Sequence, residues 1–284
     1  MLYYANRFTD AVEKCLPAAE QGDALAQYML GMCYRCEGRA GSYDKGTEWY
    51  KRAAESLKIA AEEGSLRASF LLGDVYRFGK AGTYSNNEAM KWYAKAMEGY
   101  QALALQGDLE ALYMLGRCYY FEMGVKPDKK KAFGYFDEAA LRGHALAQHR
   151  LAHCYTFGSG VKTNASRAVY WFAKASAQGI VEAMGDLGLF YYCGCGVEQD
   201  YQEAVIWLER AIELGDDDSD TLEYLAVCYG WGFGTARNVL KAVEYLERVA
   251  DRGYHSARAL LEELSDEGVE AADEALERLG DEYV

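Results

Sequence analysis

Hydrophobic positions recur along this chain in one pattern that returns six times. Each copy holds a leucine, a glycine or alanine directly after it, and a tyrosine three residues further on, as in Leu30, Gly31 and Tyr34. Ala26, Leu30 and Tyr34 are spaced four apart, so they share one face of a helix. The pattern predicts an amphipathic helix with a small residue where a neighbouring helix approaches. The six small residues are Gly31, Gly73, Gly116, Ala152, Gly188 and Ala226.

A second helix is predicted in the other half of each copy. An alanine follows the tyrosine after thirteen residues in five copies, with Gly46 after twelve in the first, and a large ring comes three residues later. Loop glycines such as Gly158 and Gly160 suit the positive φ at the end of the first helix. The expected N-caps of the second helix are Asp128, Asn164, Asp200 and Asn238. The rings are Trp49, Trp92, Tyr135, Trp171, Trp207 and Tyr245, and the closing glycines are Gly64, Gly107, Gly143, Gly179, Gly215 and Gly253.

This spacing resembles that of the Sel-one-like repeat (SLR) family, whose members are relatives of tetratricopeptide repeat proteins. Residues 183–197 and 131–140 match the family pattern nearly letter for letter, and the resemblance covers roughly residues 10–262. Met123-Gly124 replaces the usual glycine pair, which is a local departure. The resemblance implies a helical repeat protein that works as an adaptor for other proteins.

We therefore predict an all-α fold, a right-handed α-α superhelix (α-solenoid) of about six helix-turn-helix repeats with capping helices at both ends. The expected organisation is a single solenoid over residues 1–284. Its parts are an N-terminal cap at 1–22 that resembles a second helix, repeats at 23–64, 65–107, 108–143, 144–179, 180–215 and 216–253, and an acidic C-terminal cap at 254–284. From Glu262 onward we expect one polar helix.

The first two repeats are longer than the others. Trp49 to Gly64 and Trp92 to Gly107 each span fifteen residues, against eight later. The excess of seven is close to two turns of an α-helix, so the second helix is predicted to be extended with its apolar face in phase. Neutral drift of a spacer and an added ridge or dimer surface both remain open as explanations.

Charge and hydropathy narrow the range of partners. The net charge is −14, and residues 262–284 contribute −9 of it, with ten acidic residues against Arg278. An acidic chain without a basic patch argues against nucleic acid as a partner. No apolar run is long enough to span a membrane, and Met1–Asp10 lacks the apolar core of a signal peptide, so we expect a cytoplasmic protein. We interpret the acidic C-terminal end as a cap. Alternatively, it folds back onto arginines of the surface that would bind a partner.

Eight cysteines do not suggest a disulfide framework. Four of them occupy the same register position, directly before the repeat tyrosine, which indicates a core position filled by reduced thiols. These four are Cys33, Cys118, Cys154 and Cys228. Cys33 with Cys36, and Cys193 with Cys195, leave a metal or redox role open as an alternative.

No catalytic site is predicted. His149 and His153 have the i,i+4 spacing that presents two metal ligands on one helical face, but no glutamate accompanies them in an H-E-x-x-H arrangement. Gly158-Ser159-Gly160 is explained by the repeat register, not by a nucleophile elbow. We expect no enzyme, no cofactor and no metal.

The predicted function is protein–protein interaction. In the related tetratricopeptide fold the first helix of each repeat lines the concave face, so its variable positions are expected to bind a peptide or protein segment, one with an acidic group or C-terminal carboxylate. A structural protein that dimerises through the extended helices is one alternative, and a metal- or redox-linked protein is another. The predicted partner-binding residues are Tyr28, Met32, Arg35, Phe70, Asp74, Arg77, Tyr113, Arg117, Tyr120, His149, His153 and Tyr192.

Overall fold

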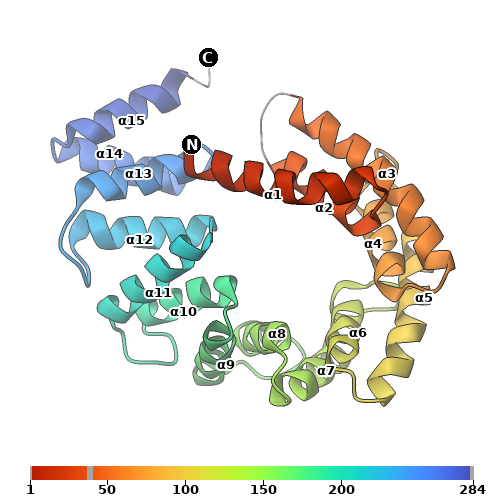
Figure 1. Ribbon diagram of the computed structural model, residues 1–284. Coiled ribbons are helices and arrows are strands. Elements are labelled where there is room, and N and C mark those ends of the chain that lie inside the picture. Colours follow the sequence, from red (N-terminus) through yellow and green to blue (C-terminus); the bar gives the residue numbers. More distant parts are fainter. Residues whose placement is uncertain (1, 37–40, 282–284) are drawn as a thin grey trace. The chain divides into compact units, whose positions relative to one another are not determined.

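The structure is a computed structural model that describes residues 2–36 and 41–281, and this part of the chain is helical without strands (Figure 1). The prediction of an all-α repeat fold is confirmed. The helices are α1 (Leu2–Glu20), α2 (Ala24–Cys36), α3 (Ser42–Glu62), α4 (Leu66–Arg77), α5 (Asn86–Leu105), α6 (Leu109–Phe121), α7 (Lys129–Leu141), α8 (Ala145–Phe157), α9 (Ala165–Ala177), α10 (Val181–Cys193), α11 (Tyr201–Leu214), α12 (Ser219–Trp231), α13 (Val239–Ala250), α14 (His255–Asp266) and α15 (Glu270–Asp281).

The helices pair in the order that the repeats predict. The chain forms two compact units, Met1–Tyr135 and Phe136–Val284, and each is described by itself. In the first unit α2 packs against α3 and α4 against α5; in the second, α8 packs against α9, α10 against α11 and α12 against α13. We call the first helix of each repeat helix A (α2, α4, α6, α8, α10, α12) and the second helix B (α3, α5, α7, α9, α11, α13).

The repeat tyrosine sets where helix B begins. The backbone N–H of Asn164 donates to the carbonyl of Tyr155 at 2.9 Å, and the Asn164 side chain accepts from the N–H of Arg167 at 3.0 Å. This pair of bonds satisfies a free donor of the first turn and fixes the entry angle of the chain. Asp128, Asp200 and Asn238 make the same two bonds, which confirms all four predicted caps.

A close contact between helices A and B joins the repeat glycine to a ring. A Cβ atom added to Gly73 would lie 2.6 Å from the ring of Tyr93, and one added to Gly31 would lie 2.8 Å from the ring of Tyr50. Both rings are almost fully buried. The glycines therefore allow helix B to seat an aromatic ring directly on the backbone of helix A.

The buried ring is the residue after the one that the sequence pattern singled out. Trp49 and Trp92 are half-buried, whereas Tyr50 and Tyr93 beside them have 2% and 0% of their surface exposed. The same position holds Phe172 in α9 and Leu208 in α11, also buried. The sequence signal was the apolar residue that recurs directly after each large ring.

The predicted extension of helix B is confirmed in the first two repeats. Helices α3 and α5 have 21 and 20 residues, against 12 to 14 in the later B helices. The added turns bury Leu57, Ala61 and Tyr100, so the apolar face does stay in phase. The ammonium of Lys95 also donates to the carbonyl of Ala61 at 2.6 Å, which ties α5 to the end of α3.

The C-terminal region departs from the expected single polar helix. It contains α14 and α15, separated at Gly268, which has a φ of 84°. Helix α15 packs against α13 and α14 through Ala272, Ala275 and Leu279, all buried in one cluster with Leu261. The acidic composition of this region hid the second helix, because three small or aliphatic residues among many acids still form an apolar stripe.

No helix in the described ranges has both the length and the apolar character needed to cross a bilayer.

The contact between glycine and ring predicts a large difference between two glycine-to-alanine substitutions. Gly73→Ala forces a methyl group into the ring of Tyr93 and is expected to lower the free energy of unfolding by about 1–3 kcal/mol. Gly134→Ala, on an exposed face of α7 with no atom within 4 Å, is expected to raise it by up to about 1 kcal/mol. Urea denaturation followed by circular dichroism measures both. Equal effects of the two variants would contradict the proposed contact.

Candidate functional site

Three repeats have an aromatic residue two positions before the repeat leucine, and these residues, which we call the aromatic row, are buried. Tyr28, Phe70 and Tyr113 have 7%, 2% and 6% of their surface exposed. Tyr28 meets Tyr50 edge to face at 5.3 Å between ring centroids, and Phe70 meets Tyr93 in the same way at 5.2 Å. These rings pack in the core beside helix B, and little of their surface is open to a partner.

Asp74 is also drawn into this core. Its carboxylate accepts a hydrogen bond from the hydroxyl of Tyr93 at 2.5 Å, and 9% of the residue is exposed. Burial, followed by the charge of Asp74, raises the pKa of Tyr93, which keeps the phenol protonated as a donor. Asp74 therefore supports the packing of α4 on α5.

Three arginines of the first unit remain partly exposed on its A helices. Arg35 donates to the carbonyl of Lys80 at 3.1 Å and lies 4.4 Å from the ring centroid of Tyr43. Arg77 donates to the carbonyl of Glu122 at 2.8 Å. These carbonyl bonds orient the guanidinium groups but do not neutralise their charge. We call Arg35, Arg77 and Arg117 the arginine row.

Arg117 lies over the buried aromatic row. Its guanidinium carbon is 4.9 Å from the ring centroid of Phe70 and 5.9 Å from that of Tyr113. One nitrogen also contacts the sulfur of Met114 at 3.7 Å. Contact with aromatic rings restricts the orientation of the guanidinium, and its N–H donors remain able to bind another group.

The arginine row has no carboxylate partner within residues 2–36 and 41–281. Each ion pair found in that part of the chain involves other cations. In the second unit, by contrast, Arg237 pairs with Glu267 and Arg278 with Glu247. The row therefore combines fixed orientation with uncompensated positive charge, which suits an anionic group.

The remaining predicted contact residues lie at different depths. Met32 is exposed by 45%, and Tyr120 is half-buried with its ring edge to face on Phe121 at 4.7 Å. Tyr192, in the second unit, lies against the rings of Tyr201 and Tyr224.

The two helix A histidines meet a carboxylate that the sequence analysis did not include. The Nε2 atom of His149 lies 2.8 Å from Oδ2 of Asp186, and the Nε2 atom of His153 lies 3.3 Å from the same oxygen and 3.0 Å from Nε2 of His149. His149 and Asp186 come from α8 and α10. Although burial favours the neutral acid, hydrogen bonds from both imidazoles hold the pKa of Asp186 below its usual value. Among the described residues, these three are the group of histidine, cysteine and acidic side chains arranged to hold a metal ion.

The position of Asp186 within its repeat could have revealed this cluster from the sequence. Asp186 directly precedes the repeat leucine, Leu187. The other copies have apolar, aromatic or basic residues at that position, namely Met29, Leu71, Met114, Arg150 and Tyr224. An acid at this position was therefore the departure that marked a polar cluster.

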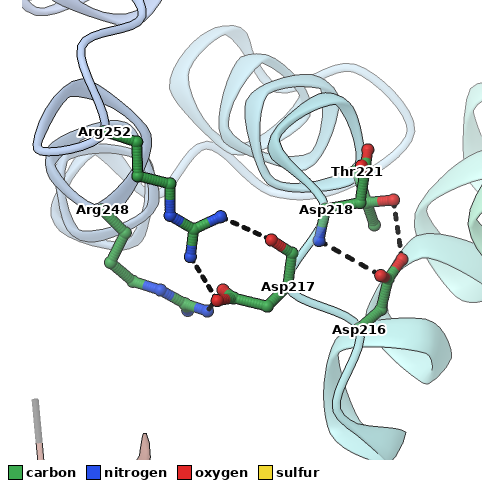
Figure 2. A network of polar contacts seen from close by, with 6 residues as sticks. All are labelled: Asp216, Asp217, Asp218, Thr221, Arg248 and Arg252. Carbon is green, nitrogen blue, oxygen red and sulfur yellow. Dashed lines mark hydrogen bonds and ion pairs between the residues drawn. The ribbon is translucent and has the colours of Figure 1, made fainter. Parts of the chain in front are cut away.

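Three consecutive acids, Asp216, Asp217 and Asp218, accompany two extra residues before the leucine of the sixth repeat, and this acidic insertion has a structural role. Figure 2 shows Asp217, in the loop between α11 and α12, facing Arg248 and Arg252 of the α13 region. Asp218 caps α12, and Asp216 accepts from the hydroxyl of Thr221 at 2.8 Å. All three carboxylates have partners, so this cluster is not a cation site.

A glycine makes room for this network. A Cβ atom on Gly185 would lie 2.8 Å from Oδ2 of Asp216 and 2.7 Å from the hydroxyl of Thr221. Gly185 occupies the register position that holds Tyr28, Phe70 and Tyr113 in other repeats. The inserted acids and Thr221 thus fill space that a ring takes elsewhere.

Three of the four register cysteines are core residues, as predicted. Cys118, Cys154 and Cys228 are buried, with at most 1% of their surface exposed. Burial raises the pKa of Cys118 and of Cys228 to about 12, which keeps both thiols protonated and unreactive. Cys33 is half-buried, and the side chain of Cys36 lies outside the described residues. Cys193 and Cys195 are exposed.

Comparison with known proteins identifies the repeats. The Sel1 repeat matches at residues 24–56, 66–99, 109–144, 145–180, 181–216 and 219–254. No curated protein matches the chain.

Solved structures share the fold. A protective antigen of uropathogenic Escherichia coli with an SLR fold is 27% identical, with a TM-score of 0.59 over 95% of this chain and 56% of that protein. The chain therefore spans little more than half the length of that relative. A Sel1 repeat protein from Oxalobacter formigenes is 23% identical, with a TM-score of 0.52 over 89% of this chain and 90% of that one. An immunity protein from Pseudomonas aeruginosa is 20% identical, with a TM-score of 0.51 over 80% and 81%.

The Asp217 network predicts a measurable loss of stability on substitution. Asp217→Ala leaves the guanidinium groups of Arg248 and Arg252 without their carboxylate, and we expect the free energy of unfolding to fall by about 1–2 kcal/mol, because the pair is only partly exposed. Glu138→Ala breaks an exposed pair with Arg142 at 3.6 Å and serves as the control, with no measurable change expected. Urea midpoints that are equal for the two variants would show that the network is not stabilising.

Proposed function

This chain belongs to the Sel1 repeat family, and we propose that it is a non-catalytic scaffold that binds a segment of another protein on the A helices of its first unit. Sel1 repeat proteins generally mediate protein–protein interactions, and the family is generally non-enzymatic. Binding of this kind needs an exposed surface held rigidly by packed repeats. The A helices supply that surface, and the ring contacts described above hold it.

The observation that carries this proposal is the arginine row. Arg35, Arg77 and Arg117 recur on successive A helices, are oriented by carbonyls or rings, and lack a carboxylate partner within the described residues. Guanidinium groups that are already oriented lose little side-chain entropy on binding. They can donate two parallel hydrogen bonds to a carboxylate. We infer that the bound segment carries an acidic side chain or a free C-terminal carboxylate.

Apolar contact would come from residues that neighbour the row. Met32 is exposed by 45%, and Tyr120 is partly exposed on α6. Methionine adapts its shape to a partner, and tyrosine contributes a large area at low entropic cost. The proposed partner is thus a protein segment and neither nucleic acid nor membrane.

A cytoplasmic setting is part of the proposal. It is supported by Cys118, Cys154 and Cys228, which fill core positions as free cysteines instead of forming a recurring framework of disulfides between helices.

Self-association is the competing function, and two side chains favour it. Ile59 on α3 and Leu105 on α5 are exposed by 60% and 90% in the extended parts of these helices. Light scattering of the full chain and of an Ile59→Glu/Leu105→Glu variant tests this alternative. A dimer that the double substitution dissociates would establish it, and a monomer for both proteins would remove it.

The scaffold proposal predicts selective loss of peptide binding. Arg77→Ala/Arg117→Ala is expected to weaken binding by roughly tenfold or more, because two donors to the carboxylate are removed. The probe is an array of peptides with free C-terminal carboxylates and internal acids, measured beside the same peptides as amides. Binding should fall when the carboxylates become amides and when salt is added.

A matched control separates charge on helix A from charge in general. Arg52 and Arg210 also lie over aromatic rings, those of Trp49 and Trp207, but on B helices. Arg52→Ala/Arg210→Ala should bind the peptides as the unsubstituted protein does. The proposal fails if both double variants bind equally well, or if amidated peptides bind as tightly as acids.

A further inference from the structure

We propose that His149, His153 and Asp186 form a binding site for a divalent transition-metal ion, and that Zn²⁺ is the ion that this donor set fits. The site lies within the second unit and is independent of the arginine row. It departs from our sequence-based expectation that the chain has no metal site, because that expectation considered the histidines without a third ligand.

The three donor atoms form a triangle that is slightly smaller than one face of a zinc coordination tetrahedron. Zinc binds imidazole nitrogen and carboxylate oxygen at about 2.0–2.2 Å, so two ligands of a tetrahedral site lie about 3.3–3.6 Å apart. Here the three separations are 2.8, 3.0 and 3.3 Å. Opening the triangle by a few tenths of an ångström, through small side-chain rotations, would admit the ion.

Both imidazoles present Nε2, a nitrogen that can bind a metal ion, to the same carboxylate oxygen. A neutral imidazole offers at Nε2 either one N–H donor or one lone pair. When both Nε2 atoms carry a proton, the two imidazoles donate to the same oxygen of Asp186; when the proton is on Nδ1 instead, each Nε2 offers a lone pair. A cation at the centre would bind one lone pair from each of the three residues.

The helices hold the three side chains in place before any ion binds. Histidines at i and i+4 project from the same face of α8, and α9 packs against both α8 and α10. Asp186 is flanked by Met184 and Leu187, each with 1% of its surface exposed, which fixes the backbone that carries the carboxylate. A site of this kind loses little conformational entropy when it is occupied.

The surroundings favour a bound cation. Phe172, which is buried, lies 5.2 Å from the ring of His153 and 5.9 Å from that of His149, and Phe157 stacks on His153 at 5.9 Å. These rings exclude water on one side and strengthen the electrostatic interaction. Asp220 of α12 adds negative charge near Asp186. Burial, followed by the charges of Asp218 and Asp186, raises the pKa of the Asp220 carboxyl group.

Three protein ligands leave the fourth coordination position open. Structural zinc sites usually have four protein ligands, whereas a site with three keeps a position for water or an incoming group. Among first-row ions, two imidazoles and one carboxylate favour zinc over Mg²⁺, which prefers oxygen ligands. The inferred site is therefore one where zinc holds an exchangeable water.

Zinc titration of the full, untagged and chelator-treated chain tests the proposal. Calorimetry should show one Zn²⁺ per chain, no comparable binding of Mg²⁺, and a higher melting temperature with zinc. Asp186→Asn and His153→Gln, which nearly preserve side-chain size, should each weaken zinc binding at least roughly tenfold, because each removes one ligand. The control His255→Gln changes an exposed histidine at the start of α14 and should bind zinc normally.

Cobalt supplies a second measurement that does not depend on the variants. Co²⁺ bound to four ligands absorbs visible light far more strongly than hydrated Co²⁺, so the unsubstituted chain should develop this absorption at one equivalent and lose it when zinc is added. Absence of saturable zinc binding by the unsubstituted chain would overturn the proposal. Equal affinity of the Asp186→Asn, His153→Gln and His255→Gln variants would overturn it as well.

Discussion

Close approach of helix B to the backbone of helix A is the constraint on which the rest of this structure depends. Gly31, Gly73 and Gly188 each lie under a side chain of the following helix, at distances that leave no room for a methyl group. The buried rings of Tyr50 and Tyr93 then pack edge to face against Tyr28 and Phe70 of the aromatic row. That row in turn supports the guanidinium of Arg117, so the exposed charge is positioned by a contact made two layers below it.

The repeat register made the fold predictable to the level of caps and turns. Leucine, small residue and tyrosine recur at fixed spacing, and Asn164 and its equivalents start helix B where the pattern places them. Depth within a helix was harder to predict. Tyr28 and Arg35 both occupy variable positions of helix A, yet Tyr28 is buried. It packs against the ring of Tyr50, a residue that the sequence pattern did not single out. The pairing of His149 with Asp186 joins two repeats, and a pattern that compares equivalent positions does not reveal contacts between different ones.

One register position serves three purposes in this chain. Two residues before the repeat leucine, Phe70 builds core, His149 joins a polar cluster, and Gly185 admits the Asp216 network. The repeat tolerates this variety because each helix pair contacts only its neighbours, so a local change is absorbed within one or two repeats. New chemistry can therefore arise at a core position without loss of the fold, provided that the space is filled.

The glycine and its ring also limit how such a chain can change by recombination. A crossover in the loop between two repeats moves Gly73 together with Tyr93, and the close contact travels intact. A crossover between α4 and α5 separates them, and a helix A with alanine at that position, such as α12 with Ala226, would have to shift to accept the ring of Tyr93. The whole hairpin is thus the smallest segment that can be duplicated or exchanged without repair elsewhere.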